Sequence, residues 1–265
     1  MKPKALVLQA HGSNRDFDVM DALTLAGADP TGIPLNELRI AARNTLFRNF
    51  DLLIVPGGFS YADALGAGKL LALDLASYFA DEISAFVESG KPVIGICNGF
   101  QALVKSGILP FGNKDERGKN DSEATLTFNQ QGHFECRWVN LKPVSQKCIW
   151  TKDLSDNITC PIAHGEGNFQ TTELFSISSF IANDQIALTY IHADRSSANG
   201  EYPINPNGSV LDIAGICNPQ GNVLGLMPHP ENHIHTWQHP RHTRGEHGGS
   251  GLRLFENGVK YASQI

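Results

Sequence analysis

The pentapeptide G-I-C-N-G at residues 95–99 places Cys97 between two glycines, where an apolar segment gives way to a helical pattern. A G-x-nucleophile-x-G sequence of this kind forms a tight strand-to-helix turn that presents its central side chain at the edge of a sheet. The helix N-terminus favours a thiolate, and the N–H of Asn98 points toward any oxyanion formed on a substrate. The chemistry expected is nucleophilic attack by Cys97. The alternative is a small buried core residue, the usual role of a free cysteine.

The tetrapeptide G-I-C-N recurs at residues 215–218 and provides an internal comparison. Pro219 stands there in place of the second glycine, and a short turn leads to another strand instead of a helix. Cys217 therefore lacks both the strained turn and the helix N-terminus, and we predict that it is structural. The remaining cysteines have no supporting sequence context, and they are Cys136, Cys148 and Cys160.

A histidine and a glutamate two residues apart, His229 and Glu231, lie in M-P-H-P-E at 227–231. Each proline favours extended geometry in the residue before it, so both side chains are expected on the same side of an extended chain. A carboxylate beside an imidazole fixes the tautomer and leaves the other ring nitrogen for a thiol. The segment predicts a general base with its orienting carboxylate. The alternative is a surface loop that carries a solvated pair.

Other histidines compete for a chemical role, and five of them follow Glu231: His233, His235, His239, His242 and His247. Their spacing does not match an H-E-x-x-H helix, and no cysteine or carboxylate cluster accompanies them. This favours a polar loop rich in titratable side chains over a metal site. His164 lies in A-H-G-E-G-N-F at 163–169, where two glycines beside His164 and Glu166 indicate close approach of the backbone to a ligand.

The elements that must position these residues begin with three apolar segments, predicted to form buried strands at 5–8, 51–58 and 91–97. Helical patterns follow them at 16–26, 69–88 and 98–107. Ser13 or Asn14 is expected to cap the first helix. Continuous apolar strands that alternate with helices indicate a parallel sheet with both faces covered.

The second half of the chain has a different pattern. Alternating polar and apolar residues at 133–141 and 186–191 predict antiparallel or edge strands. N-P-Q-G at 218–221 predicts a hairpin, and a helix is expected over 251–262. The predicted fold class is α/β, with a largely parallel central sheet flanked by helices and additional antiparallel strands in the second half.

Size and charge limit the possible functions. The chain has 265 residues, of which 41% are hydrophobic, and this is enough to bury a sizeable core. No repeat or linker interrupts it, so we expect a single domain over 1–265. The formal charge is −6 and no basic cluster is present, which argues against nucleic acid or an anionic membrane as a partner.

The length of the apolar stretches and the spacing of the cysteines indicate the cellular compartment of the protein. The apolar stretch at 5–8 is too short for a signal-peptide core, and no stretch approaches the ~20 apolar residues of a membrane-spanning helix. Five cysteines without C-x-x-C spacing disfavour a disulfide framework and a structural zinc site. The cytoplasm is therefore the expected location.

Six segments together resemble the class I, or triad, glutamine amidotransferases, and more narrowly the glutaminase components of phosphoribosylformylglycinamidine synthase. G-I-C-N-G-F-Q at 95–101 and M-P-H-P-E at 227–231 carry the resemblance to the wider family. The narrower resemblance comes from V-P-G-G-F-S-Y-A-D at 55–63, F-E-C-R-W-V at 134–139, A-H-G-E-G-N-F at 163–169 and Y-P-I-N-P-N-G-S at 202–209. One departure is Ala62, where the family often has glycine.

The resemblance implies Cys97 as nucleophile, His229 as general base and Glu231 as its partner, acting through a glutamyl thioester. It implies an oxyanion hole formed by the N–H groups of Asn98 and of Gly58 or its neighbour Phe59. The residues that it places at the glutamine pocket are Gln101, His164, Gly165 and Glu166. The plain alternatives are that Gln101 is a polar helix residue and that the H-G-E-G segment is only a turn.

Partners follow from the same resemblance. It implies a separate ATP-dependent synthetase that converts formylglycinamide ribonucleotide to formylglycinamidine ribonucleotide, and a small third subunit that bridges the two. ATP and Mg²⁺ would belong to the synthetase, so no cofactor and no metal are expected in this chain.

Three alternatives stay open: a glutaminase that serves another acceptor synthetase, a DJ-1/PfpI-like cysteine hydrolase, and a non-enzymatic glutamine-sensing module. The His–Glu pair late in the chain argues against the DJ-1/PfpI-like hydrolase.

Overall fold

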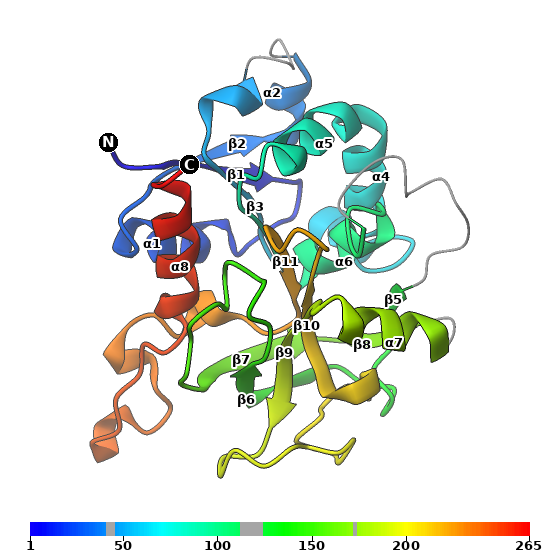
Figure 1. Cartoon of the computed structure of the whole chain (residues 1–265), viewed down its shortest axis with the longest axis vertical. Coiled ribbons are helices and arrows are strands. Elements are labelled where there is room, and N and C mark those ends of the chain that lie inside the picture. The colour runs from blue at the N-terminus through cyan, green and yellow to red at the C-terminus, as the bar shows by residue number, and fades with distance from the viewer. Residues whose placement is uncertain (41–45, 112–123, 172–173) are drawn as a thin grey trace.

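The computed structural model describes residues 1–40, 46–111, 124–171 and 174–265, which are built around a nine-stranded sheet (Figure 1). The strands lie in the order β2 (Asp29–Pro34), β1 (Lys4–Gln9), β3 (Leu52–Val55), β4 (Val93–Ile96), β11 (Val223–Leu226), β10 (Ile213–Cys217), β9 (Ile186–Ile191), β6 (Glu135–Pro143) and β7 (Ile158–His164). The four pairs from β2 to β11 are parallel, and the four pairs from β11 to β7 are antiparallel. This division confirms the predicted fold class.

Three strands of the parallel half are apolar along their whole length. All residues of β3, β4 and β11 are buried, as expected for strands in a sheet that is covered on both faces. Their side chains belong to a hydrophobic core cluster that also contains residues of the antiparallel half.

Helices cover both faces of this parallel half (Figure 1). α1 (Asp16–Leu25) and α8 (Leu252–Ala262) pack together on one face. α4 (Lys69–Tyr78) and α6 (Asn98–Lys105) pack together on the other face. The remaining elements are α2 (Leu35–Ile40), α5 (Ala80–Glu88), α7 (Leu174–Ala182) and a two-stranded antiparallel sheet of β5 (Ala124–Thr127) and β8 (Asn168–Thr171).

Two predictions about the helices were wrong. The single helix expected over 69–88 is two helices, because Phe79 leaves helical geometry at φ −129° between α4 and α5. The residue before α1 is Arg15, with no capping side chain. The expected caps are used elsewhere, since Ser13 forms a β-bridge with Gly58 and Asn14 packs against the same glycine.

The predictions for the second half were largely confirmed. β10 and β11 form an antiparallel hairpin around the turn at 218–221, and the antiparallel pairs of β6 and β9 account for the alternating segments. The apolar segment at 210–217, which precedes the hairpin turn, is strand only from Ile213 onward. Its first three residues, Val210–Asp212, form a 3₁₀ turn. Within the described ranges, no helix is both long and apolar enough to span a membrane.

Candidate active site

Cys97 occupies the junction of β4 and α6 in a backbone conformation that few side chains adopt. Its φ of 48° and ψ of −105° are strained for a non-glycine residue. The glycines on either side make this turn possible. A Cβ on Gly99 would lie 1.9 Å from the carbonyl oxygen of Val55, and one on Gly95 would lie 2.4 Å from Leu103 Cδ1. The turn predicted from the pentapeptide is therefore present, with both glycines required by packing.

The sheet brings His229 to Cys97 from a distant part of the chain. β11 lies beside β4 and parallel to it, with Leu226 paired to Ile96. Parallel neighbours end at the same edge of a sheet, so the residues that follow both strands meet there. Cys97 comes directly after β4, and His229 follows β11 by three residues. The Cys97 sulfur lies close enough to the His229 ring to favour its protonated form, and Sγ donates to the backbone oxygen of Ala163 at 3.7 Å.

Glu231 completes the arrangement. Its Oε1 lies 2.6 Å from Nδ1 of His229, and both side chains are almost fully buried. Because an ionised carboxylate only accepts, Nδ1 carries the proton and the other ring nitrogen is left for the Cys97 sulfur. The backbone expectation was wrong: Pro230–Asn232 form a 3₁₀ turn rather than an extended chain, and this turn brings the carboxylate back to the ring.

The charge state of His229 follows from these contacts. Burial by itself disfavours the protonated ring, but the Glu231 carboxylate and the Cys97 sulfur favour it and raise the pKa of His229 to about 10. These contacts favour the cationic ring at neutral pH. An imidazolium beside a cysteine sulfur is the arrangement that holds a nucleophilic thiolate and can later give a proton to a leaving amine.

A cavity of about 150 Å³ opens beside the sulfur, and Cys97 itself is 5% exposed. Six of the residues predicted for the oxyanion hole and the glutamine pocket line it, namely Gly58, Phe59, Gln101, His164, Gly165 and Glu166. Asn98 heads α6, where the first N–H groups of a helix have no partner within the helix. Gly58 has a φ of 121°, which only glycine adopts readily, so the strand end beside the cavity depends on that residue.

Gln101 and Glu166 are tied to each other and to neighbouring elements. Gln101 Nε2 donates to the Glu166 backbone oxygen at 2.7 Å, and its Oε1 accepts from Asn98 at 3.2 Å. The Glu166 carboxylate accepts from the N–H of Ala67 at 3.1 Å and pairs with Lys105 at 3.2 Å. Both amide atoms of Gln101 are thus engaged by the protein, so this side chain positions the cavity wall.

His164 is a neutral, buried acceptor. Burial, and then the proximity of His229, lower the pKa of His164 to about 3. Asn129 donates to a backbone oxygen through its Nδ2, so its Oδ1 accepts from Nδ1 of His164 at 3.1 Å. Nε2 then carries a bare lone pair, with no hydrogen-bond partner among the described residues. The ring lies over Gly167, where a Cβ would come within 2.2 Å of it, so this glycine of the H-G-E-G segment makes room for His164 rather than for a ligand.

Sequence reasoning missed several residues around the cavity. Asp63, Phe128 and Phe134 line it, and Asn129 and Lys105 hold its walls. The first of these ends the segment V-P-G-G-F-S-Y-A-D, so its motif was recognised but its side chain was not. Phe134 begins F-E-C-R-W-V, which was also recognised. Phe128 and Asn129 follow β5 and Lys105 ends α6, and the direction of these side chains depends on the tertiary packing.

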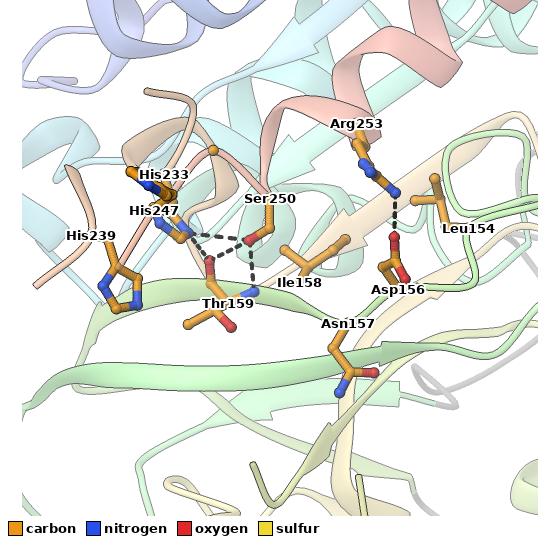
Figure 2. Close-up of a pocket in the computed structure, with 12 residues that line it drawn as sticks. Leu154, Asp156, Asn157, Ile158, Thr159, His233, His239, His247, Ser250 and Arg253 are labelled. Carbon is orange, nitrogen blue, oxygen red and sulfur yellow. Dashed lines mark hydrogen bonds and ion pairs between the residues drawn. The ribbon is translucent and has the colours of Figure 1, made fainter. Parts of the chain in front are cut away.

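The histidine-rich stretch is better ordered than a solvated loop. His233 is buried, its Nδ1 contacts the Thr159 backbone oxygen and lies 3.2 Å from Ser250 Oγ, and Trp138 packs edge-on against its ring. Figure 2 shows His233, Thr159 and Ser250 beside a cavity of about 360 Å³ that is also lined by His239 and His247. In the described part of the chain, no three His, Cys, Asp or Glu side chains are placed to hold a metal ion.

Of the other four cysteines, Cys160 lies beside Glu231 and His229, and the other three line no part of the cavity beside Cys97. Cys148, Cys160 and Cys217 are buried, and Cys136 is exposed on β6. Cys217 is the last residue of β10, with a turn and then β11 after it, as its sequence context predicted. Burial raises the pKa of the Cys160 thiol, and nearby Glu231 raises it further, so this sulfur stays neutral.

Comparison with known proteins identifies the family. A family model described as a CobB/CobQ-like glutamine amidotransferase domain matches residues 2–262. A Treponema denticola protein named phosphoribosylformylglycinamidine synthase subunit PurQ is 54% identical, over 98% of this chain and 99% of the relative. A protein of the same name from Dehalococcoides mccartyi is 40% identical, over 100% of this chain and 99% of the relative.

A solved structure gives the same result. A chain in the structure described as PurLQS from Thermotoga maritima is 31% identical, with a TM-score of 0.72 over 98% of this chain and 99% of that chain. The chain therefore belongs to the CobB/CobQ-like glutamine amidotransferases, in the family of the phosphoribosylformylglycinamidine synthase subunits named PurQ.

Proposed function

We propose that this chain hydrolyses glutamine and delivers the ammonia to a separate synthetase, as the PurQ subunit of phosphoribosylformylglycinamidine synthase. The observation that carries the proposal is the contact of Cys97, His229 and Glu231 at one sheet edge, in a chain of this family. Family membership favours this function over a DJ-1/PfpI-like hydrolase. The names of the relatives favour the purine synthetase over another ammonia acceptor.

The first half of the reaction uses the protonated imidazole. The Cys97 sulfur attacks the carboxamide carbon of glutamine, and the carbonyl oxygen becomes an oxyanion. The N–H of Asn98, at the positive end of α6, and an N–H of Gly58 or Phe59 stabilise this charge. His229 then gives its proton to the amide nitrogen, ammonia leaves, and a glutamyl thioester remains on Cys97.

The second half reverses the proton transfer. His229, now neutral, takes a proton from a water molecule as that water attacks the thioester carbon. The tetrahedral intermediate collapses with Cys97 as the leaving group, which releases glutamate and restores the starting charge state. Glu231 holds the ring in place and stabilises its protonated form throughout.

The acceptor chemistry belongs to the partner. The synthetase subunit would bind ATP and Mg²⁺ and convert formylglycinamide ribonucleotide to the amidine, with a small third subunit between them. The name PurLQS of the Thermotoga structure supports an assembly of this composition. We propose that the chain itself uses no cofactor and acts in the cytoplasm, where its free thiols stay reduced.

Replacement of the nucleophile tests the proposal in the assembled complex. Cys97→Ala should abolish glutamate release and glutamine-dependent amidine formation, while amidine formation from added ammonium chloride continues at the wild-type rate. Cys217→Ala is the matched control, because that thiol lies outside the cavity, and it should retain both activities. Glutamine-dependent activity that survives in Cys97→Ala would refute the triad, and a wild-type complex that releases no glutamate would refute the function.

A further inference from the structure

Three consecutive residues beside the cavity hold a left-handed backbone conformation. Tyr61, Ala62 and Asp63 have φ values of 54°, 53° and 52°. Non-glycine residues rarely adopt this conformation, because it brings Cβ close to the carbonyl oxygen that follows it. Such strain persists only where surrounding contacts impose it, and it gathers at functional sites. Ala62, where the family often has glycine, is the middle residue of this run. The chain therefore carries a methyl group at a position where glycine would relieve the backbone strain.

The strained run directs one charged side chain into the cavity wall. Asp63 lines the same cavity as Cys97, Gln101 and Glu166. Its carboxylate accepts from Asn98 Nδ2 at 2.9 Å and from the backbone N–H of Gly68. Since Asn98 directly follows the nucleophile, this bond fixes the carboxylate relative to the sulfur.

Asn98 is itself held so that its amide group must face Asp63. Its Oδ1 accepts from the N–H of Ser60 at 3.3 Å and from the Ser60 hydroxyl at 2.5 Å. Its Nδ2 is therefore free to donate to Asp63 and Gln101. A carboxylate has about four acceptor sites, and two are used here, so Asp63 retains capacity for a further donor.

The two carboxylates that line the cavity, Asp63 and Glu166, differ in their ionic partners. Glu166 is paired with Lys105 at 3.2 Å, whereas no ion pair of Asp63 is present among the described residues. Burial raises the pKa of Asp63 and the nearby Glu166 charge raises it further, while the bond from Asn98, the backbone N–H of Gly68 and the more weakly acting Lys105 charge oppose this without cancelling it. A cation placed against Asp63 would relieve both unfavourable effects.

Free glutamine brings such a cation. Its carboxamide must reach Cys97, and the other end of the molecule carries an α-ammonium group with three donors. A cavity of about 150 Å³ removes water from that group, so a compensating charge must come from the protein. We infer that Asp63 binds the α-ammonium group of glutamine and makes the site specific for the free amino acid, an inference that rests on the proposed glutaminase function.

A pair of substrates separates this role from a structural one. 4-Carbamoylbutanoate has the side chain and carboxylate of glutamine but lacks the α-amino group, and ammonia release reports the hydrolysis of both compounds. In the wild-type complex, kcat/KM should be on the order of 100-fold higher for glutamine, as expected when a site built for a charged hydrogen bond meets a substrate without it. If the wild-type complex hydrolyses both compounds equally well, the inference is overturned whatever any variant does.

Asp63→Asn removes the charge and keeps an acceptor for Asn98. We expect kcat/KM for glutamine to fall by roughly 30- to 100-fold, mostly through KM, with a change of less than about 3-fold for 4-carbamoylbutanoate.

Asp74→Asn is the matched control. Asp74 accepts from the Tyr61 hydroxyl and so supports the strained run from outside the cavity. Loss of its charge should change kcat/KM for both substrates by the same factor. Equal losses for both substrates in Asp63→Asn would show a structural role and overturn the inference. A wild-type complex inactive on glutamine would instead refute the glutaminase itself.

Discussion

Among individual residues, His229 has the most constrained environment at the site. Its ring lies between a carboxylate 2.6 Å away and a cysteine sulfur, and a Cβ on Gly57 would come within 2.8 Å of its Cε1. The raised pKa also links this ring to stability. A histidine whose pKa rises from about 6.5 to about 10 on folding contributes stability that is fully present below pH 6.5 and is lost as the pH rises toward 10.

Glu231→Gln should shift the pH profile of the glutaminase. The amide removes the negative charge that favours the imidazolium, so the pKa of His229 falls, and the alkaline limb of kcat moves to lower pH by roughly one to two units. The maximum of kcat should also fall by about 10²-fold, because the ring is no longer held in one tautomer. Glutamate release measured from pH 6 to pH 10.5 checks this, and an unchanged alkaline limb would show that another group titrates there.

At the residue scale, the sequence pointed to Cys97, His229 and Glu231 and to six residues that line the cavity, but not to the hydrogen-bond partners that hold the cavity walls. Cys97 and His229 stand out because the glycine and proline contexts are specific. Asp63 and His164 depend on long-range contacts, namely Asn98 for the first and Asn129 for the second. A sequence pattern carries no information about which partner a buried polar side chain will meet.

At the element scale, the β4–α6 junction depends on how closely the helix approaches β3. Gly99 lies against the backbone at the end of β3, and Gly95 lies against Leu103 of α6. The glycines therefore set the depth at which α6 docks on the sheet, and this depth determines where Cys97 emerges. The same closeness places the helix N-terminus beside the cavity.

Gly99→Ala should destabilise the fold strongly. The new Cβ would meet the Val55 carbonyl oxygen at 1.9 Å, and because that atom is backbone, the strand and the helix must separate. We expect the free energy of unfolding to fall by about 3 kcal/mol or more. Urea denaturation followed by circular dichroism measures the change.

Gly165→Ala is the control for this prediction. Its Cβ would have one neighbour, Phe134 at 3.8 Å, which is ordinary contact, so its unfolding free energy should change by less than about 1 kcal/mol. Equal destabilisation of the two variants would mean that the closeness of α6 to β3 is not what limits stability.

Element boundaries were less predictable than element types. The apolar strands and the helix after Cys97 could be predicted because each has an unbroken pattern. The break at Phe79 could not, since residues 69–88 keep a helical pattern through it and the side chain is buried in the core. The turn at Pro230–Asn232 was missed because proline is compatible both with extended chain and with the first position of a helix.

At the scale of the whole molecule, the sheet combines two strand directions, and the site lies where they meet. β11 belongs to both halves, since it runs parallel to β4 and antiparallel to β10. The cavity lies at the carboxyl edge of the parallel half, and exposed aromatic residues surround it: Phe59, Phe128 and Phe134. The α/β class followed from the alternation of strands and helices, but the neighbourhood of β4 and β11 could not be read from segments so far apart.

The isolated chain should be a slow glutaminase that is activated by its synthetase. Gly57 and Gly58 lie at the strand end that we propose to supply one oxyanion-hole amide. Glycine leaves this backbone free to turn that amide away from the cavity, and we expect a docked partner to restrict the freedom. We expect glutamate release to rise by at least about tenfold, equivalent to about 1.4 kcal/mol of barrier, when purified synthetase is added. Titration of the synthetase at fixed glutamine measures the effect, and full activity of the chain alone would contradict it.

The adjacency of β4 and β11 also matters while the protein is being made. The ribosome synthesises Cys97 long before it synthesises β11 and His229. A nascent or prematurely terminated chain therefore contains the Cys97 thiol without the imidazole that we propose as its base. We therefore expect glutamine hydrolysis to begin only after β11 has joined β4 in the middle of the sheet, and unfinished copies of the chain to hydrolyse no glutamine.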